Sequence, residues 1–592
     1  MRNARLHRES SLKNDGILGM CKPTRYTDEI FEEYFGKGFW TADTTSKLWE
    51  ENARRHPDRE AFVSSNKRIS WSQVKELSDR LALGFLKIGL GRDDRLLMIL
   101  PNCCESYIVR VACEKAGILC GTTLTGLRER EIEYICSKIF HPVAIAIPWQ
   151  FRRFNYYRAI EEIRTGLPTL RHIFVLGQGL SSGTISIEKL MEEPLERRDQ
   201  KASFEDTEYN ATEVSVIAFT SGTTGNPKGV EHCQCARMAM ARAYGEAVDL
   251  TGDDIVLNVI SGVGGVGAAF CYNGATALVC AKTVLLEIWN AEDALKQIAD
   301  ERVTILLAVP AQLAQIVRHP TIGNHDLSSL RCVCSGTAPL SPALAERVEE
   351  KLKVPVINTY GQMDGGLVAK VNIGSPPQIR YRTVGKPPKG SLIRIVGENG
   401  REVPQGEAGE IIYAGPTTSA GYYRDLESTL EGWGRLGKEG FFRSGDLGRL
   451  DESGNLVILG RKREVIIRGG QNIYPIEIEE LLLENPKVKS VAIIPMPDPI
   501  MGEKVCAYVS LMPGEDLTFE EMISHLRSKK IALYKLPERL EILDELTMRH
   551  HHKIVKAELC QDLICKLKKE GKLSALAPFE YDQKQQEGLE DR

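Results

Sequence analysis

One run of glycines and hydroxyl residues restricts the fold more than any other part of the sequence. It reads FTSGTTGNPKG at residues 219–229, between the apolar run 214–218 and the helix-like run 233–246. This order predicts a buried strand, a flexible loop and a helix. The glycines let backbone N–H groups approach an anion, while the hydroxyls and Lys228 add donors and positive charge. We therefore expect the loop to hold a polyphosphate.

The loop is not a Walker A sequence, because Pro-Lys-Gly closes it where Gly-Lys-Ser/Thr would stand. This difference excludes the P-loop nucleoside triphosphatases (NTPases). A surface turn rich in Ser, Thr and Gly is the structural alternative. Further motifs are needed to decide between a turn and a phosphate site.

Length, charge and cysteine content narrow the class of protein. A chain of 592 residues predicts two or more domains. A net charge of −4, from 76 basic and 80 acidic residues, predicts no general attraction to nucleic acid or to an anionic membrane. The 15 cysteines include no C-x-x-C pair, which favours a reducing, cytoplasmic location over a disulfide framework. Metal binding by His232, Cys233 and Cys235 is a minor alternative to burial of free cysteines.

Two segments resemble membrane or targeting signals only superficially. Residues 255–281 carry no charge, but glycines and asparagines divide them into an expected strand, a Gly-rich bend, a short helix and another strand. We therefore expect no transmembrane segment. Residues 1–8 are basic and lack an apolar core, which argues against secretion and leaves a mitochondrial presequence as a weak alternative.

The order of apolar runs predicts an α/β fold. Strand-like runs at 96–100, 143–147, 172–176, 304–309 and 354–357 alternate with amphipathic helices such as 71–88. Short strands between turns at 390–414 predict a small β-rich subdomain. We expect a poorly ordered tail at 1–25, a large domain at 26–460, a hinge at 461–464, a small α+β domain at 465–572 and a polar tail at 573–592.

Several motifs follow the loop in a fixed order, over roughly residues 45 to 570. They are SGTAPL at 335–340, NTYGQMD at 358–364, FRSGD at 442–446, GR at 460–461, EVIIRGGQNIYPIEIE at 464–479 and LTMRHHHKIVK at 546–556. With the loop, they resemble the AMP-forming acyl-adenylating enzymes, the superfamily of acyl-CoA synthetases, peptide-synthetase adenylation domains and firefly luciferase. The resemblance implies a large N-terminal AMP-binding domain of two α/β subdomains and a β-rich subdomain, followed by a small mobile C-terminal domain.

The resemblance also implies roles for individual residues. Tyr360 would pack on adenine, Asp446 would accept both ribose hydroxyls and Arg461 would contact the ribose. The whole set expected to bind ATP or CoA is Thr220, Ser221, Gly222, Thr223, Thr224, Gly225, Lys228, Gly336, Thr337, Ala338, Tyr360, Gly361, Gln362, Asp446, Arg461, Gly469 and Gly470. Within it, Gly469 and Gly470 would line the passage of a pantetheine arm, although a hairpin turn is the structural alternative.

Catalytic roles fall on Lys553, Asp364 and Thr223 by the same resemblance. Lys553 takes the position of the adenylation lysine, Asp364 would be the Mg²⁺ ligand and Arg463 the hinge pivot. The cofactors implied are ATP, Mg²⁺ and CoA.

The chain departs from the family pattern at two of these motifs. His551 and His552 stand where Ser-Gly usually precedes the lysine, and metal binding by the three histidines is a minor alternative. Met363 and Asp364 replace Thr-Glu, so the carboxylate is one methylene shorter and coordination of Mg²⁺ through water is expected.

The acyl pocket that the resemblance implies is lined by small, mostly apolar residues. Its residues are Val259, Ser261, Val263, Gly264 and Gly265. They predict a roomy cavity with no base or hydroxyl-reading group, suited to an aliphatic, alicyclic or simple aromatic acid.

These motifs predict a carboxylate–CoA ligase that forms acyl-AMP and pyrophosphate, and then acyl-CoA and AMP, as a monomer or homodimer. Loading of a carrier-protein phosphopantetheine is one alternative. The departures at 363, 364 and 552 raise another, a catalytically weakened protein that binds a nucleotide or an acyl-AMP.

Overall fold

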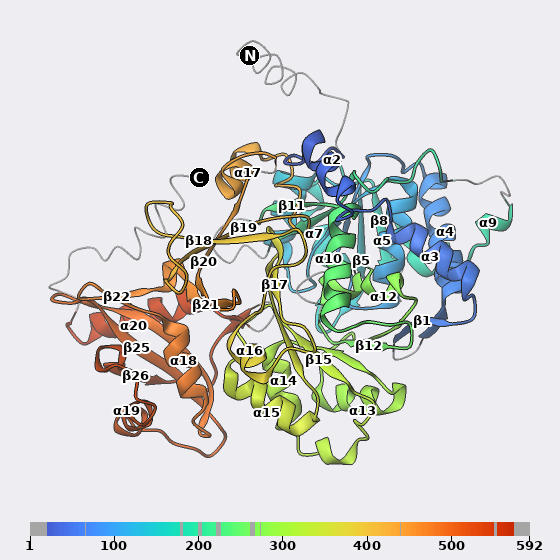
Figure 1. Ribbon diagram of the computed structural model, residues 1–592. Helices are drawn as coiled ribbons and strands as arrows, with labels where there is room; N and C mark the ends of the chain where they lie inside the picture. The colour runs from blue at the N-terminus through green and yellow to red at the C-terminus, as the bar shows by residue number, and fades with distance from the viewer. Residues whose placement is uncertain are drawn as a thin grey trace, which may run out of the picture.

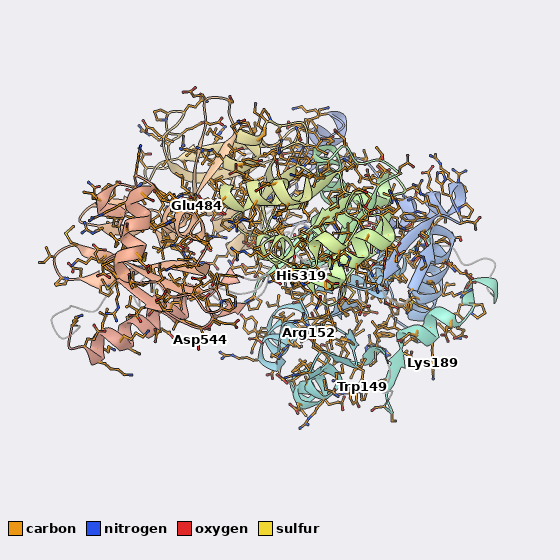
Figure 2. The ribbon with its side chains drawn as sticks, turned by 90° about the horizontal axis from the view of Figure 1, so that it is seen from below. Trp149, Arg152, Lys189, His319, Glu484 and Asp544 are labelled. Carbon is orange, nitrogen blue, oxygen red and sulfur yellow. The ribbon has the colours of Figure 1, made fainter. Side chains whose placement is uncertain are left out.

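The computed structural model describes residues 21–64, 67–177, 181–198, 204–220, 227–260, 267–272, 274–437, 440–549 and 553–572. It is an α/β protein in which the C-terminal part, orange to red in Figure 1, lies to one side of the larger remainder. Figure 2 shows Glu484 and Asp544 on this C-terminal part and Lys189 near the opposite end. No helix among the described residues is long and apolar enough to cross a membrane.

One parallel sheet carries the strand that leads into the glycine-rich loop. Its order is β11-β10-β4-β3-β5-β8-β9, and all neighbours are parallel except β10 and β11. The strands are β3 (Arg95–Met98), β4 (Leu119–Thr122), β5 (Ala144–Pro148), β8 (His172–Leu176), β9 (Thr184–Ser186), β10 (Val214–Phe219) and β11 (Gly229–Cys233).

The second sheet is parallel except at its two edges. Its order is β17-β16-β15-β14-β12-β13-β1-β2, with β2 and β17 antiparallel to their neighbours. The strands are β1 (Glu60–Ser64), β2 (Lys67–Ser70), β12 (Ile255–Asn258), β13 (Lys282–Leu285), β14 (Ile305–Leu307), β15 (Cys332–Ser335), β16 (Val356–Gln362) and β17 (Gly366–Lys370). A shared apolar core holds the two sheets together, since Met98 of the first and Val256 of the second belong to one buried cluster.

An antiparallel sheet completes the larger part. It consists of β18 (Leu392–Val396), β19 (Gly409–Ala414), β20 (Phe442–Leu450) and β21 (Leu456–Arg461). The β-rich subdomain therefore continues to Arg461, well beyond the 390–414 stretch that the turn signals identified.

The C-terminal part has its own sheet and core. Its strands are β22 (Ile466–Arg468), β23 (Gln471–Ile473), β24 (Val488–Asp498), β25 (Gly502–Leu511) and β26 (Arg539–Ile542). Ile466, Ile478 and Val505 are fully buried in one cluster of this part. A short hairpin, β27 (Met548–Arg549) with β28 (Lys553–Ile554), precedes the last helix. A second hairpin, β6 (Gln150–Phe151) with β7 (Phe154–Asn155), lies far from it in the sequence.

Helices pack on the sheets, and α10 packs on α12 and on the π-helical turn η3 (Ala268–Tyr272). The helices are α2 (Asp28–Gly36), α3 (Thr45–Arg55), α4 (Trp71–Ile88), α5 (Cys104–Ala116), α6 (Glu129–Tyr134), α7 (Tyr156–Ile163), α8 (Ile187–Glu192), α9 (Leu195–Arg198), α10 (Gln234–Ala247), α12 (Ala275–Leu278), α13 (Ala291–Glu301), α14 (Pro310–Val317), α15 (Pro342–Leu352), α16 (Pro377–Arg382), α17 (Leu426–Trp433), α18 (Pro475–Leu483), α19 (Phe519–Ser528) and α20 (Lys556–Lys569).

Two expectations need correction. The glycine-rich loop does not lead directly into a helix, because residues 229–233 first return as β11, antiparallel to β10. Residues 21–25, assigned to a poorly ordered tail, are packed against the body. The Thr24 N–H donates to the Glu231 carboxylate at 2.7 Å, and the buried Arg25 guanidinium donates to the Ser419 carbonyl at 2.9 Å.

Candidate active site

A large cavity lies where the loop hairpin, β16, the antiparallel sheet and the C-terminal part meet. Its volume is about 2530 Å³. The predicted site residues on its wall are Thr220, Lys228, Thr337, Ala338, Tyr360, Gly361, Gln362, Asp364, Asp446, Arg461 and Arg463. Residues that are separated by more than 200 positions in the sequence are thus brought to one site.

The two ends of the glycine-rich loop are joined by hydrogen bonds. Thr220 N–H donates to the Lys228 carbonyl at 3.0 Å, and Lys228 N–H donates to Thr220 Oγ1 at 2.9 Å. The Lys228 ammonium donates to Ser428 Oγ at 3.0 Å and lies 4.7 Å from the ring centroid of Tyr422. The predicted residues Ser221, Gly222, Thr223, Thr224 and Gly225 lie outside the described residues. Thr220 and Lys228 therefore join the two ends of the loop, and the Lys228 ammonium places a positive charge at the cavity wall.

Asp446 on β20 is the centre of a hydrogen-bonded cluster. It accepts from the Tyr360 hydroxyl and from Gln362 Nε2, the latter at 2.7 Å. Arg461 Nε lies 2.9 Å from the second carboxylate oxygen, because β20 and β21 pair Asp446 with Arg461. Burial, together with the Asp446 charge, raises the pKa of Tyr360. The donors fix the position of a carboxylate that has the acceptor geometry for a vicinal diol.

Backbone geometry shapes the two turns beside this cluster. Thr337 has a φ of 71°, a left-handed conformation that costs energy for a branched residue and is often found at functional sites. Its hydroxyl donates to the Gly336 carbonyl, and Gly336 is absent from the described cavity wall. A Cβ at Gly361 would lie 2.6 Å from the Gly366 carbonyl oxygen, so only glycine fits there.

Asp364 supplies a carboxylate to the cavity wall near Lys228. One of its oxygens accepts from the Tyr422 hydroxyl at 2.6 Å. An oxygen ligand of this kind suits Mg²⁺, which takes few protein ligands and completes its shell with phosphate and water oxygens. The donor chemistry therefore fits a Mg²⁺ ion held jointly by Asp364 and a nucleotide.

A half-buried ion cluster joins the hinge region to the C-terminal part. Lys556, the first residue of α20, places its ammonium 2.9 Å from Glu464 and 2.8 Å from Glu479 of α18. Burial alone would lower the pKa of Lys556, but the attraction of the two carboxylates outweighs it and raises this pKa. Arg463 lies in the short turn Lys462–Glu464, so the predicted pivot is directly beside the cluster.

Three other predicted residues, Lys553, Gly469 and Gly470, are not among the described residues of the cavity wall. The backbone of Lys553 lies in β28, opposite Arg549, and its side chain is outside the described residues. Gly469 and Gly470 form the turn between β22 and β23 with φ values of 55° and 82°. Both are exposed, and neither is among the residues that line the cavity. Gly469 and Gly470 therefore form the turn of the β22–β23 hairpin.

Only one of the residues predicted for the acyl pocket, Val259, belongs to the described part of the chain. Val259 is in the apolar core and not on the described wall, and its carbonyl accepts from Gln312 Nε2 at 3.0 Å. Ser261, Val263, Gly264 and Gly265 lie outside the described residues. The described cavity wall also includes residues of β11, α10 and η3 that the sequence interpretation missed: His232, Arg237, Met240, Tyr244 and Tyr272. The spacing 237, 240, 244 puts three of these on one face of a helix, which was the available signal.

Comparison with known proteins gives a consistent assignment. The sequence profile of a family described as "AMP-binding enzyme" matches residues 49–423, and that of the "AMP-binding enzyme C-terminal domain" matches residues 477–553. Triostin synthetase I of Streptomyces triostinicus is 30% identical, with 90% of this chain and 97% of the relative covered. The medium-chain fatty-acid–CoA ligase of Escherichia coli (strain K12) is 29% identical, with 90% and 93% covered.

Solved structures share the fold at lower identity. The anthranilate CoA ligase AuaEII in complex with anthranoyl-AMP has a TM-score of 0.81 and 22% identity, with 90% of this chain and 98% of that one covered. ATP-bound MatB from Rhodopseudomonas palustris has a TM-score of 0.76 and 23% identity, with 88% and 99% covered.

Proposed function

The chain belongs to the AMP-binding enzymes, the superfamily of AMP-forming acyl-adenylating ligases, and from this premise we propose that it is an ATP-dependent carboxylate–CoA ligase. One observation carries the proposal. The cluster of Asp446, Tyr360, Gln362 and Arg461 is assembled on the same cavity as Lys228 and Asp364. This arrangement supports the proposal that Asp446 and its donors bind a ribose, that Lys228 binds phosphates and that Asp364 binds a metal ion.

In the first half-reaction, the substrate carboxylate attacks the α-phosphorus of ATP and pyrophosphate leaves. Asp446 orients the ribose, and Lys228 with the loop holds the departing pyrophosphate by its charge and its N–H donors. Asp364 would hold Mg²⁺, which supplies charge neutralisation of the phosphates when bound. Lys553 would stabilise the negative charge that grows during attack. Positioning and electrostatics carry this step without a covalent enzyme intermediate.

In the second half-reaction, the CoA thiol attacks the acyl carbonyl and AMP leaves. We propose that the small domain, residues 465–572, turns at 461–464 about Arg463 for this step. The turn at Gly469 and Gly470 then moves from its exposed position to the passage of the pantetheine arm. A few residues in a short turn are sufficient to absorb such a rotation.

Two coupled assays test the function with the purified full-length chain. Acid-dependent ATP–pyrophosphate exchange measures adenylation, and CoA-dependent AMP release measures thioester formation across a broad panel of acids. Lys553→Ala is expected to abolish exchange while ATP binding persists. Exchange without CoA-dependent release, together with thioester formation on a carrier protein, would contradict CoA as the acceptor. ATP binding without exchange for any acid would contradict a catalytic role altogether.

We propose the cytoplasm as the location, as the cysteine content suggests. One relative, an acyl-CoA ligase of Mus musculus that is 28% identical, is named as mitochondrial. Cell fractionation with an antibody to the chain distinguishes the two compartments.

A further inference from the structure

One buried tyrosine on the cavity wall contacts two groups of opposite charge. Tyr422 is 6% exposed. Its ring centroid lies 4.7 Å from the Lys228 ammonium, and its hydroxyl donates to one carboxylate oxygen of Asp364 at 2.6 Å. All three residues line the cavity. A single side chain therefore contacts a cation through its ring and a carboxylate through its hydroxyl, and these are the two groups that the proposed function assigns to the phosphates and the metal ion.

The backbone of this tyrosine is fixed to the strand that follows the glycine-rich loop. Residues 420–423 pair with β11, where the Glu231 N–H donates to the carbonyl of residue 421 and the Glu231 carbonyl accepts from the N–H of residue 420, each at 2.9 Å. The Tyr423 N–H donates to the Gly229 carbonyl at 2.8 Å. Tyr422 therefore has a fixed position relative to the base of the loop.

The same segment holds both the tyrosine ring and the backbone of the carboxylate residue. The ring of Tyr422 packs edge to face on Trp433, with the two centroids 5.5 Å apart, and the Tyr422 N–H donates to Thr429 Oγ1 at 2.9 Å. The Ser419 hydroxyl donates to the Asp364 carbonyl. Asp364 is thus held by this segment at its backbone and at its side chain.

The bond from Tyr422 uses only one of the two carboxylate oxygens of Asp364. Its Oδ2 accepts from the tyrosine, and its Oδ1 accepts from none of the residues that the structure describes. A carboxylate held in this way keeps one oxygen for a metal ion. Donors behind a metal-ligating carboxylate orient it, and their loss typically lowers metal affinity or activity by about 10- to 100-fold.

Building on the proposed ligase function, we propose that Tyr422 is a positioning residue for the metal–nucleotide complex. Its hydroxyl orients the Asp364 carboxylate for Mg²⁺, and its ring holds the Lys228 ammonium for the phosphates that bind the same ion. Tyr422 takes no part in bond making and acts through these two residues.

Calorimetric binding of α,β-methylene-ATP to the full-length protein, with Mg²⁺ or with EDTA, tests this role without turnover. In wild type, Mg²⁺ is expected to tighten binding. Tyr422→Phe keeps the ring and removes the hydroxyl, so the tightening by Mg²⁺ should fall by about tenfold, the lower end of the range for such donors, while the affinity in EDTA stays unchanged. Tyr422→Leu also removes the ring, so it should weaken binding in EDTA as well.

A double-mutant cycle shows whether the tyrosine acts through the carboxylate. In Asp364→Ala, the further change Tyr422→Phe should leave the effect of Mg²⁺ unaltered, because no carboxylate remains to be oriented. Tyr413→Phe is the matched control. Tyr413 belongs to the same buried cluster as Tyr422, its hydroxyl has no hydrogen-bond partner among the described residues, and it is not among the described residues of the cavity wall.

Three results would overturn the inference and leave the ligase function standing. They are equal tightening by Mg²⁺ in wild type and Tyr422→Phe, an equal effect of Tyr422→Phe with and without the Asp364 carboxylate, and an equal loss in Tyr413→Phe. A Tyr422→Phe chain that does not fold would show a structural role for the hydroxyl and overturn it too. The ligase function fails separately, when no acid supports ATP–pyrophosphate exchange. No binding of the analogue by wild type would remove the nucleotide site, and both proposals with it.

Discussion

Replacing Lys556 by methionine tests whether the ion cluster holds in place the β27–β28 hairpin, which carries the proposed catalytic Lys553. Lys556 follows β28, the strand that contains Lys553, by two residues. Its ammonium contacts Glu464 in the hinge turn and Glu479 on α18. Methionine keeps most of the length of the side chain and removes the charge, so two carboxylates remain at the cavity wall without their cation. The hairpin then loses its tether to the hinge.

The geometry sets the size of the effect. The side chains of Lys556, Glu464 and Glu479 are 19%, 34% and 18% exposed, so water reaches the cluster and weakens it. Exposed ion pairs contribute about 0–1 kcal/mol, and removing one partner of a buried pair costs about 3–5 kcal/mol. We expect a cost between these limits, roughly 2–3 kcal/mol, which corresponds to roughly 30- to 160-fold in an equilibrium. This range is the upper limit for the fall in adenylation rate.

The assay compares the two half-reactions. In Lys556→Met, ATP–pyrophosphate exchange is expected to fall much more than CoA-dependent release of AMP from added acyl-AMP. Lys566→Met is the matched control, because Lys566 is on the same helix and contacts two carboxylates, Glu541 at 2.6 Å and Asp562 at 2.8 Å, away from the cavity. Exchange within twofold of wild type would refute the tether. Full loss of exchange in Lys556→Met, with exchange retained in Lys553→Ala, would instead identify Lys556 as the catalytic lysine.

Three further predictions concern other parts of the site. Burial raises the pKa of Glu231 from 4.5 to about 8, so between these pH values the folded state holds a proton that the unfolded state releases. The free energy of unfolding should therefore fall as pH rises from 4.5 to about 8. Glu231→Gln should flatten this pH dependence in denaturant titrations, whereas the same pH dependence in the variant and the wild type would contradict the raised pKa. Asp446→Asn should raise KM for ATP about tenfold in exchange assays, since a charged acceptor is lost, whereas an unchanged KM would exclude a ribose contact. Gly470→Ala introduces a side chain at a φ of 82° in open space, so it should slow CoA-dependent AMP release and spare exchange; equal loss of both would argue against a passage role.

Elements with strong local signals were predicted well from the sequence. Helix α4 has the predicted bounds, 71–88, because its ends are fixed locally: Ser70 and Gln73 form a capping box, and Gly89 closes the helix at a φ of 93°. The parallel strands were recognised by their apolar runs: β8 has the predicted bounds, 172–176, most other bounds shifted by one or two residues, and β16 ends at Gln362, five residues beyond the predicted 354–357. Local capping and burial are encoded in neighbouring residues, which explains this success.

Features that depend on distant partners were missed. Strand β11 exists because it pairs with β10, and its five residues carry no strand pattern of their own. Thr24 and Arg25 are polar residues near the start of the chain, and only the tertiary structure shows their hydrogen bonds to Glu231 and Ser419. The acyl pocket was assigned by resemblance to residues around 259–265, and the cavity-wall residues Arg237, Met240 and Tyr244 of α10 were missed. The cluster at Asp446 was identified through family motifs, because no local pattern brings it to Tyr360.

The docking of Thr24 and Arg25 has a practical consequence for work on this protein. The Thr24 hydroxyl and N–H both donate to the carboxyl group of Glu231. Glu231 follows Lys228, the residue at the base of the glycine-rich loop, by three positions. Removing residues 1–25 would therefore leave the buried Glu231 carboxyl without two donors beside the proposed nucleotide site. Truncations should stop before Cys21, and affinity tags placed at this end need a spacer ahead of that residue.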